Sequence, residues 1–367
     1  MAVQLTSPSD PTTKYLVIDG IGGVPLGREL VEAIEAEGHS AMYFDCLRQS
    51  VSPLYGLRSA CAKVINRRSE QEFYHLPRLF LGSLSQLLES ERPTHVLVVG
   101  FIYKFFDPAE LRRLTHRIGA SLLLYDTDSC NLYGKRREFI FFIEKELPVY
   151  DRIFSFSQVT TRFFVETRRL PATHLPFGAA PISLPECIEP KIDTLFVGSG
   201  DLRRIFLLEA IRDHVTVLGN RWRRHRPLIS AELQRRISDQ PVWGDELHRW
   251  LARSKIVLNI TRGDFYAAET GVNLRIFEAL AAGCFLLTDH CDEIGDLFDI
   301  GVEIDTFYSR RELTDKVRYY LQNKTQRNAI AERGHARFLA DHTWRHRVRQ
   351  LPGLAKAASQ SLQQPAV

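Results

Sequence analysis

The chain has 367 residues, of which 44% are hydrophobic and 25% are charged, and its net charge is +4. This balance is typical of a globular protein and excludes a mostly disordered chain. At roughly 150 residues per domain, the length predicts two domains. The small net charge does not by itself indicate a nucleic-acid-binding protein.

The six cysteines form no Cys-x-x-Cys pair and no zinc-like cluster with histidine. We therefore expect reduced, mostly buried thiols and a cytoplasmic protein without a bound metal. The N-terminus lacks the pattern of a secretory signal, and the longest apolar runs fall short of the ~18 residues that span a bilayer. Any contact with a membrane would be peripheral.

Short apolar runs that suit buried parallel strands recur between amphipathic stretches. In the first half they are residues 15–18, 41–44, 96–99, 122–125 and 152–156, and in the second half residues 194–197, 215–218, 256–260, 285–288 and 302–304. Helical periodicity follows the first run at 26–38 and returns at 311–323. This alternation predicts an α/β protein of two doubly wound, Rossmann-like domains that face a central cleft.

The segment 175–193 carries four prolines and has neither helical nor strand periodicity. Such a segment is typical of a linker. We predict an acceptor-side domain at 1–178, a linker at 179–191, a second domain at 192–350 and a tail at 351–367. Ligands of open α/β sheets bind at the carboxyl ends of the strands, so the cleft is the expected site.

The first strand of the second half runs into a turn of small residues, Gly198-Ser199-Gly200, and Arg203 and Arg204 follow it. Backbone N–H groups of such a turn can approach an anion. A tight turn with a helix cap explains the same residues equally well.

The stretch 201–236 is the most basic part of the chain, with nine arginines against four acidic residues. It contains the cluster at 221–226, in which Trp222 lies among arginines. Three interpretations stay open: a solvated surface, an anion-attracting wall of the cleft, or a nucleic-acid site with Trp222 available for stacking.

A helix is predicted from Gly244 and Asp245. Asn259 lies late in a buried strand, where an amide needs hydrogen-bond partners.

The densest pattern is ETGVNLRIFEALAAG at 269–283. It predicts a turn at Gly271 and a helix from about Asn273 to Gly283. Within that helix, Arg275 and Glu278 share a face, either as a surface ion pair or as groups that meet a diphosphate and a ribose.

The second half resembles the C-terminal half of the CgeB-like glycosyltransferases, which are similar to sugar transferases of the GT-B fold. The runs that carry the resemblance are GVNLRIFEALAAGCFLLTD at 271–289, EIGDLF at 293–298, GVEIDTFYSRRELTDKVRYYLQN at 301–323 and RNAIAERGHARFLADHTWRHRV at 327–348. The runs YDTDS at 125–129 and LPFGAAP at 175–181 resemble the N-terminal half more weakly. Residues 1–90 carry no specific resemblance.

The resemblance implies a hexosyltransferase-like enzyme with a GT-B-like fold. Its second domain would hold a nucleotide sugar, UDP- or GDP-linked, as substrate and not as cofactor. The implied donor-binding residues are Gly198, Ser199, Arg203, Arg204, Trp243, Gly244, Asn259, Gly271, Asn273, Arg275 and Glu278. Among them Glu278 would bind the ribose, and Trp243 and Gly244 would border the base. Many such retaining enzymes have a second glutamate at the position of Thr270, and here the nearest is Glu269, one residue away.

Glycosyl transfer builds negative charge on the leaving diphosphate, which arginines and helix N–H groups can stabilise without a metal. The acceptor is an unidentified glycan, protein or small molecule, and no nucleic acid is expected. Asp126 and Asp128 follow the strand at 122–125 and are predicted catalytic residues, with turn capping as the alternative. Asp19, after the first strand, is a further candidate for the same role.

Two other functions stay open. Gly20, Gly22 and Gly23 after the first strand favour an NAD-dependent oxidoreductase, although Pro25 stands where the fingerprint has its third glycine. The 221–226 cluster favours a non-enzymatic nucleic-acid or envelope-assembly protein. Separately, residues 135–147 are either a buried helix or a segment that docks on a membrane carrying a lipid-linked acceptor.

Overall fold

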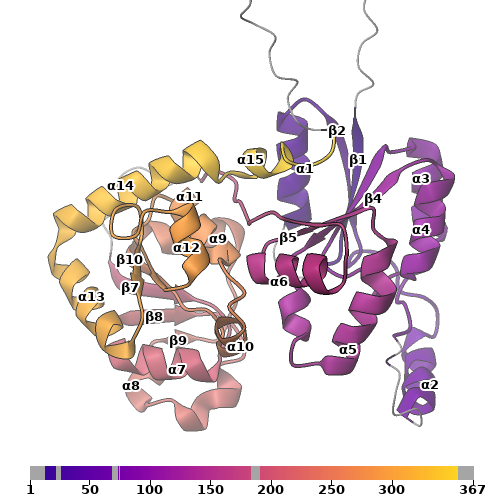
Figure 1. Cartoon of the computed structure of the whole chain (residues 1–367). Coiled ribbons are helices and arrows are strands. Elements are labelled where there is room, and N and C mark those ends of the chain that lie inside the picture. The colour runs from indigo at the N-terminus through magenta and orange to yellow at the C-terminus, as the bar shows by residue number, and fades with distance from the viewer. Residues whose placement is uncertain (1–12, 22–25, 68–72, 74, 183–190, 354–367) are drawn as a thin grey trace, which may run out of the picture.

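The computed structural model describes residues 13–21, 26–67, 73, 75–182 and 191–353. These residues form two six-stranded sheets flanked by helices (Figure 1). All strand pairs in both sheets are parallel. The strand orders are β2-β1-β3-β4-β5-β6 and β12-β11-β10-β7-β8-β9. The predicted pair of doubly wound α/β domains is thus confirmed.

The strands of the first sheet are β1 Lys14–Asp19, β2 Ser40–Asp45, β3 His95–Val99, β4 Ser121–Asp126, β5 Arg152–Ser155 and β6 Ala172–His174. Those of the second are β7 Ile192–Val197, β8 Val215–Leu218, β9 Ile237–Ser238, β10 Ser254–Asn259, β11 Leu286–Asp289 and β12 Asp305–Phe307.

The helices of the first half are α1 Leu26–Ala36, α2 Tyr55–Arg67, α3 Gly82–Glu91, α4 Pro108–Arg117, η1 Ser129–Leu132, α5 Arg136–Phe141, η2 Phe142–Glu146, η3 Leu147–Val149, α6 Gln158–Arg162 and η4 Phe163–Thr167. Those of the second half are α7 Leu202–Leu208, η5 Glu209–Ile211, η6 Arg223–Leu228, α8 Ala231–Gln234, α9 Gly244–Ala252, α10 Gly263–Ala267, α11 Leu274–Ala281, α12 Asp292–Leu297, α13 Arg310–Gln322, α14 Lys324–Asp341 and α15 Trp344–Val348.

Continuous apolar runs become the central strands because helices cover both faces of each sheet. The prediction is wrong at residues 302–304, which form a tight turn in which the Gly301 N–H donates to the Ile304 carbonyl at 2.7 Å. The strand β12 begins only at Asp305. The short edge strands β6 and β9 were not predicted, since each has only two or three residues.

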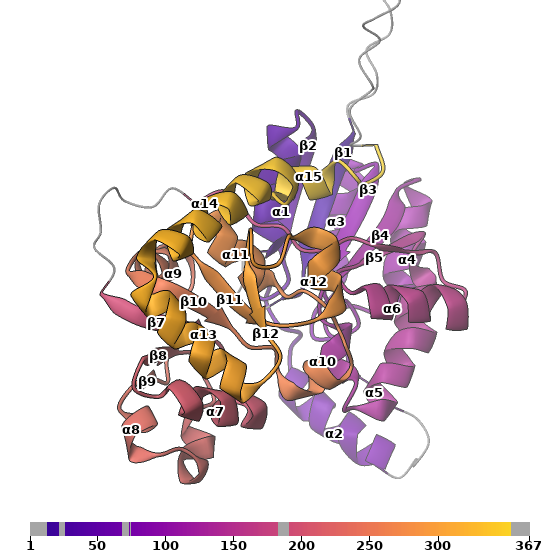
Figure 2. The same ribbon diagram turned by 60° about the vertical axis from the view of Figure 1, so that its left-hand side comes forward.

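The end of the chain returns to the first domain. Helix α15 packs on α1, and the Trp344 indole donates to the Glu29 carboxylate. The following residues pair with β1, where the Tyr15 hydroxyl donates to the Pro352 carbonyl at 2.6 Å. Residues 344–353 therefore contact the first domain, whereas the bounds predicted from the sequence place them in the second domain and the tail (Figure 2).

The segment 135–147 forms α5 and η2, which bury Phe142 and Ile143 and leave Ile140 exposed. It is thus an amphipathic helix of the first domain with one outer face. Among the described residues, no helix is both long and apolar enough to cross a membrane. Five cysteines lie in the described part of the chain, and all five are free thiols.

Candidate active site between the two sheets

Residues that follow the strands of one sheet contact residues that follow the strands of the other. The Arg262 guanidinium, after β10, donates to the Asn131 side chain, after β4. His174, at the end of β6, lies 3.0 Å from the Glu293 carboxylate, measured from Nε2 to Oε1. The carboxyl ends of both sheets therefore meet, as ligand sites in open α/β sheets require.

A cavity of about 400 Å³ lies at this meeting point. Its lining comes from α6 in the first domain and from the segments after β10, β11 and β12 in the second. The lining residues include Thr261, Tyr266, Gly271, His290 and Glu293. Of the predicted donor residues, Gly271 lines this cavity directly.

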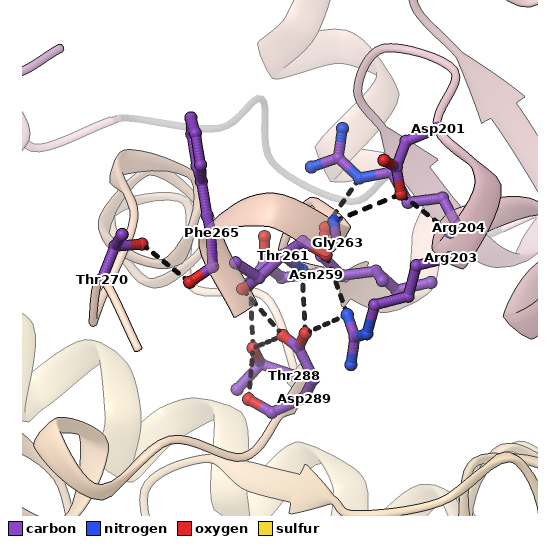
Figure 3. Close-up of polar contacts among 11 residues, drawn as sticks. Asp201, Arg203, Arg204, Asn259, Thr261, Gly263, Phe265, Thr270, Thr288 and Asp289 are labelled. Atoms are coloured by element: carbon purple, nitrogen blue, oxygen red, sulfur yellow. Dashed lines mark hydrogen bonds and ion pairs between the residues drawn. The ribbon is translucent and has the colours of Figure 1, made fainter. Parts of the chain in front are cut away.

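A network around Asp289, the last residue of β11, forms one wall of the site (Figure 3). The buried Asp289 carboxylate accepts from Arg203 Nη1 at 2.6 Å and from the Thr261 N–H at 2.9 Å. Arg203 also stacks on the Tyr266 ring, 3.7 Å from its centroid. The charge of Arg203 is therefore balanced by Asp289, and its side chain supports the cavity wall at Tyr266.

Asn259 belongs to the same network but faces the core. It is buried, and its Nδ2 donates to Thr288 Oγ1 at 2.9 Å, which ties β10 to β11 (Figure 3). Asn259 is thus a satisfied core amide that positions the strand ends.

The turn at 198–200 is packed against the end of β8. The Gly198 N–H donates to the Leu218 carbonyl and the Gly200 N–H to the Asn220 carbonyl, both at 2.8 Å. A Cβ on Gly219 would lie 2.0 Å from the Gly198 oxygen, so no larger residue fits there. Two of the N–H groups that an anion would need are thus taken by backbone carbonyls.

Arg204 holds this turn from the other side. Its Nη1 donates to the Ser199 carbonyl and its Nε to the Ile260 carbonyl, both at 2.9 Å. Burial lowers the pKa of Arg204 to about 10. Asp201 caps α7 by accepting from the Arg204 N–H. These contacts favour the tight-turn interpretation and give Arg204 a structural task.

The predicted helix at 273–283 is α11, and Asn273 caps it by accepting from the Arg275 N–H at 3.1 Å. Arg275 Nη1 lies 2.8 Å from Glu278 Oε2, and neither side chain is more than one-fifth exposed (18% and 19%). Burial raises the pKa of the Glu278 carboxyl, against the opposing effect of the Arg275 charge. The pair is therefore half-buried, unlike a solvated surface ion pair.

Glu278 lies near both domains. Burial raises the pKa of Glu29, on α1 of the first domain, to about 7, and the negative charge of Glu278 adds to this rise. The charge of His248, on α9, acts on Glu278 in turn.

Helix α9 begins at Gly244, where φ is +53°, and Trp243 before it is 43% exposed. Trp243 and Gly244, which are predicted to border a base, thus lie at the start of α9. Glu278, which is predicted to bind a ribose, lies on the neighbouring helix α11.

Asp126 and Asp128 differ in their surroundings. Asp126 is fully buried and accepts from the Ser129 hydroxyl at 2.6 Å and the Ser155 hydroxyl at 3.0 Å, so it caps the turn after β4. Asp128 is partly exposed, and burial, helped by the Asp126 charge, raises its pKa to about 6. Of the two, Asp128 has the more accessible carboxyl, which accepts from Asn131 Nδ2 at 2.7 Å.

The positive charges of Lys104 and Arg262 act on Asp128 and oppose that rise in its pKa. Because Arg262 belongs to the second domain, Asp128 lies within reach of both halves of the cleft.

Asp19, like Asp126, is held by hydrogen bonds within the first domain. Its carboxylate accepts from the Ile21 and Gly27 N–H groups and from the Tyr43 hydroxyl, and so holds the start of α1. Gly22 and Gly23 of the proposed dinucleotide turn lie outside the described residues.

Sequence reasoning missed Arg262, Tyr266, Asp289 and Glu293, although all four follow strands that were predicted. The rule that ligands meet strand ends would have selected them, had every residue after β10 and β11 been considered. Within the described ranges, no group of three histidine, cysteine, aspartate or glutamate side chains could hold a metal ion.

Comparison with known proteins bears on what the cleft does. Residues 203–353 match the family model described as "Glycosyl transferase-like". A glycosyltransferase from Rickettsia africae has a similar structure over 92% of this chain and 96% of its own, with a TM-score of 0.57 and 10% identity. Anabaena HepE, solved with UDP and glucose, is similar over 90% of this chain and 96% of its own, with a TM-score of 0.56 and 12% identity. TarM is similar over 94% of this chain and 99% of its own, with a TM-score of 0.58 and 9% identity.

The chain has the GT-B fold of these structures, and residues of its second half match a glycosyltransferase family model. No curated protein matches the sequence. The matched family and structures do not favour the oxidoreductase or the nucleic-acid alternative. The segment that matches the family model contains α11 and its Arg275–Glu278 pair.

Proposed function

We propose that this chain is a glycosyltransferase that transfers a sugar from a UDP-sugar to an acceptor hydroxyl, and that it is CgeB-like, cytoplasmic and independent of a metal. The half-buried Arg275–Glu278 pair at the start of α11 carries the proposal, because it lies in the segment that matches the glycosyltransferase family. The choice of UDP is supported by HepE, which was solved with UDP and with UDP-glucose.

In this proposal the second domain binds the donor. The Glu278 carboxylate accepts hydrogen bonds from two ribose hydroxyls, and the α9 turn at Trp243 and Gly244 borders the base. The diphosphate lies against the N-terminus of α11, whose dipole favours negative charge. Arg262 supplies positive charge beside it, and Arg275, which is paired with Glu278, supplies a smaller share. We give Arg203 a smaller share because Asp289 already balances its charge.

The reaction then breaks the bond between the anomeric carbon and the diphosphate oxygen, and forms a bond from that carbon to the acceptor oxygen. Asp128 takes the proton of the acceptor hydroxyl, for which a pKa of about 6 suits a base near neutral pH. UDP leaves with the bonding electrons, and the cations and helix N–H groups stabilise its charge in the transition state.

Calorimetric titration of the protein with UDP, GDP and NAD tests the donor site. We expect UDP to bind and Glu278→Ala to weaken it by about 10-fold or more, as expected for losing hydrogen bonds to a charged group. Glu110→Ala is the matched control, since Glu110 forms an i,i+3 pair with Arg113 on the surface. Unchanged UDP affinity in Glu278→Ala, or binding of NAD in place of UDP, would contradict the proposal.

A further inference from the structure

Large apolar side chains are exposed at one end of the molecule. Of the seven large hydrophobic side chains that are more than half exposed among the described residues, five lie on α2 or just before it, on α7 and on η6. They are Leu54, Leu57, Val64, Phe206 and Leu228, with exposures of 53% to 73%.

The elements that carry these side chains gather at one end. Helices α2, α5, α7 and α8 occupy the lower end of the molecule in both views, which differ by a turn about the vertical axis (Figures 1 and 2). The segment η6 lies beside α7, because Ser230, just after η6, donates to Glu209, just after α7. We call this end, formed by α2, α5, α7 and η6, the basal face.

The basal face is also basic. Segment η6 has the sequence RRHRPL, and its arginines at 223, 224 and 226 are exposed. Within the described residues, Arg223 pairs with Asp239 at 3.4 Å, whereas Arg224 and Arg226 have no carboxylate within ion-pair distance. Helix α5 adds exposed Arg136, and α2 adds exposed Arg58. Positive charge and aliphatic groups thus occur together on both domains.

This combination fits an anionic bilayer better than a nucleic acid. Binding of single strands combines a basic groove with several aromatic rings for stacking. Trp222, the aromatic residue of the basic cluster, is only 1% exposed and donates to the Gly198 carbonyl, and Phe206 is the single ring among the five exposed apolar side chains. The exposed groups are instead leucine, valine and phenylalanine among arginines, which is the composition that inserts at a lipid headgroup boundary.

We propose that the basal face is a peripheral membrane-binding surface that docks on anionic lipid through its arginines and inserts Phe206, Leu228, and Leu54 and Leu57 at the start of α2. The surface is continuous with the cleft, because α7 contacts α10 and the residue before α10 is Arg262, which reaches Asn131 of the first domain. Docking there would bring the mouth of the cleft to the lipid surface. This inference does not depend on the donor site, and UDP affinity is measured separately.

Sedimentation of the full chain with vesicles tests the proposal. Neutral phosphatidylcholine vesicles are compared with vesicles that contain about 30% phosphatidylglycerol, which attract basic segments. We expect binding to the anionic vesicles only, and weaker binding as salt rises. Arg224→Glu with Arg226→Glu should lower the partition coefficient by about 10-fold or more, because each basic residue near such a surface contributes appreciably.

Two further variants make the test specific. Arg113→Glu with Arg117→Glu is the matched control, since both arginines are exposed on α4, away from the basal face. It should bind vesicles like the unaltered chain. Phe206→Ser with Leu228→Ser should lower binding as well, because insertion loses apolar area. Melting curves establish that each variant is folded.

Three results would overturn the proposal. The first is equal binding to neutral and anionic vesicles, or none to either. The second is an equal loss of binding in the α4 control. The third is salt-sensitive retention on DNA without vesicle binding, which would assign the arginines to nucleic acid.

Discussion

Two aspartates, two residues apart, show how local surroundings separate roles at the residue scale. Asp126 ends β4 and Asp128 follows it, and both were predicted as catalytic. Asp126 points into the turn and has its oxygens filled by Ser129 and Ser155. Asp128 keeps a partly exposed carboxyl near cations from both domains. Spacing along the chain cannot distinguish them, because the difference arises from what packs around each carboxyl.

We predict that Asp128→Asn lowers kcat by about 100-fold or more, the usual range for a lost general base. The base must be ionised, so the activity of the unaltered enzyme should fall as the pH drops through about 6. Steady-state rates between pH 5 and pH 8 check this, with UDP affinity expected to stay the same. If the variant keeps the same acid limb and a comparable kcat, Asp128 is not the base.

At the element scale, the turn before α11 is shaped by a residue from another element. Gly271 has a φ of +85°, and a Cβ placed on it would lie 2.0 Å from Glu293 Oε2 at the start of α12. Glu293 in turn contacts His174 of the first domain. The turn therefore needs glycine for its backbone conformation and for the close approach of a carboxylate.

Gly271→Ala should destabilise the protein by about 1–3 kcal/mol, because it combines backbone strain with displacement of Glu293. Urea unfolding measures the change. Gly295→Ala is the control, since a Cβ at Gly295 meets nothing within 4 Å and the position is helical. Adding Glu293→Ala to Gly271→Ala should recover part of the loss. A Gly271→Ala variant as stable as the control would show that the turn relaxes freely.

For the whole molecule, α15 fastens the second domain to the first. The Glu37 side chain, at the end of α1, is only 1% exposed and accepts from the Nε atoms of Arg345 and Arg349, both at 2.7 Å. These hydrogen bonds, led by that of Arg349, lower the pKa of Glu37 from 4.5 to about 2. A depressed carboxyl pKa means that this stabilisation is present above pH 4.5 and is lost as the pH falls toward 2.

Arg345→Ala with Arg349→Ala should therefore lower the free energy of unfolding by about 1–2 kcal/mol at pH 7, a modest figure because both arginines are partly solvated. The difference from the unaltered chain should shrink at pH 3. Arg310→Ala with Arg311→Ala on α13 is the control and should have little effect, since the Arg311 pair with Asp315 is exposed. An undiminished difference at pH 3 would remove Glu37 from the explanation.

The sequence by itself determined the α/β class, the central strands of both sheets and the limits of α11. These features depend on neighbours in the chain: continuous apolar runs make buried strands, and Gly271, Asn273 and Gly283 punctuate a helix. The resemblance of the second half to glycosyltransferases, which the family match supports, also depends on runs of residues that are neighbours in the chain.

Only the tertiary structure decided which polar groups the cleft leaves for a ligand. Arg203 is bound by Asp289, Asn259 by Thr288, and Trp222 is buried beside Gly198. The return of α15 to α1 joins residues 315 positions apart. Such partners come together through the packing of distant strands and helices, because burial forces each polar group to find a hydrogen bond wherever the fold provides one.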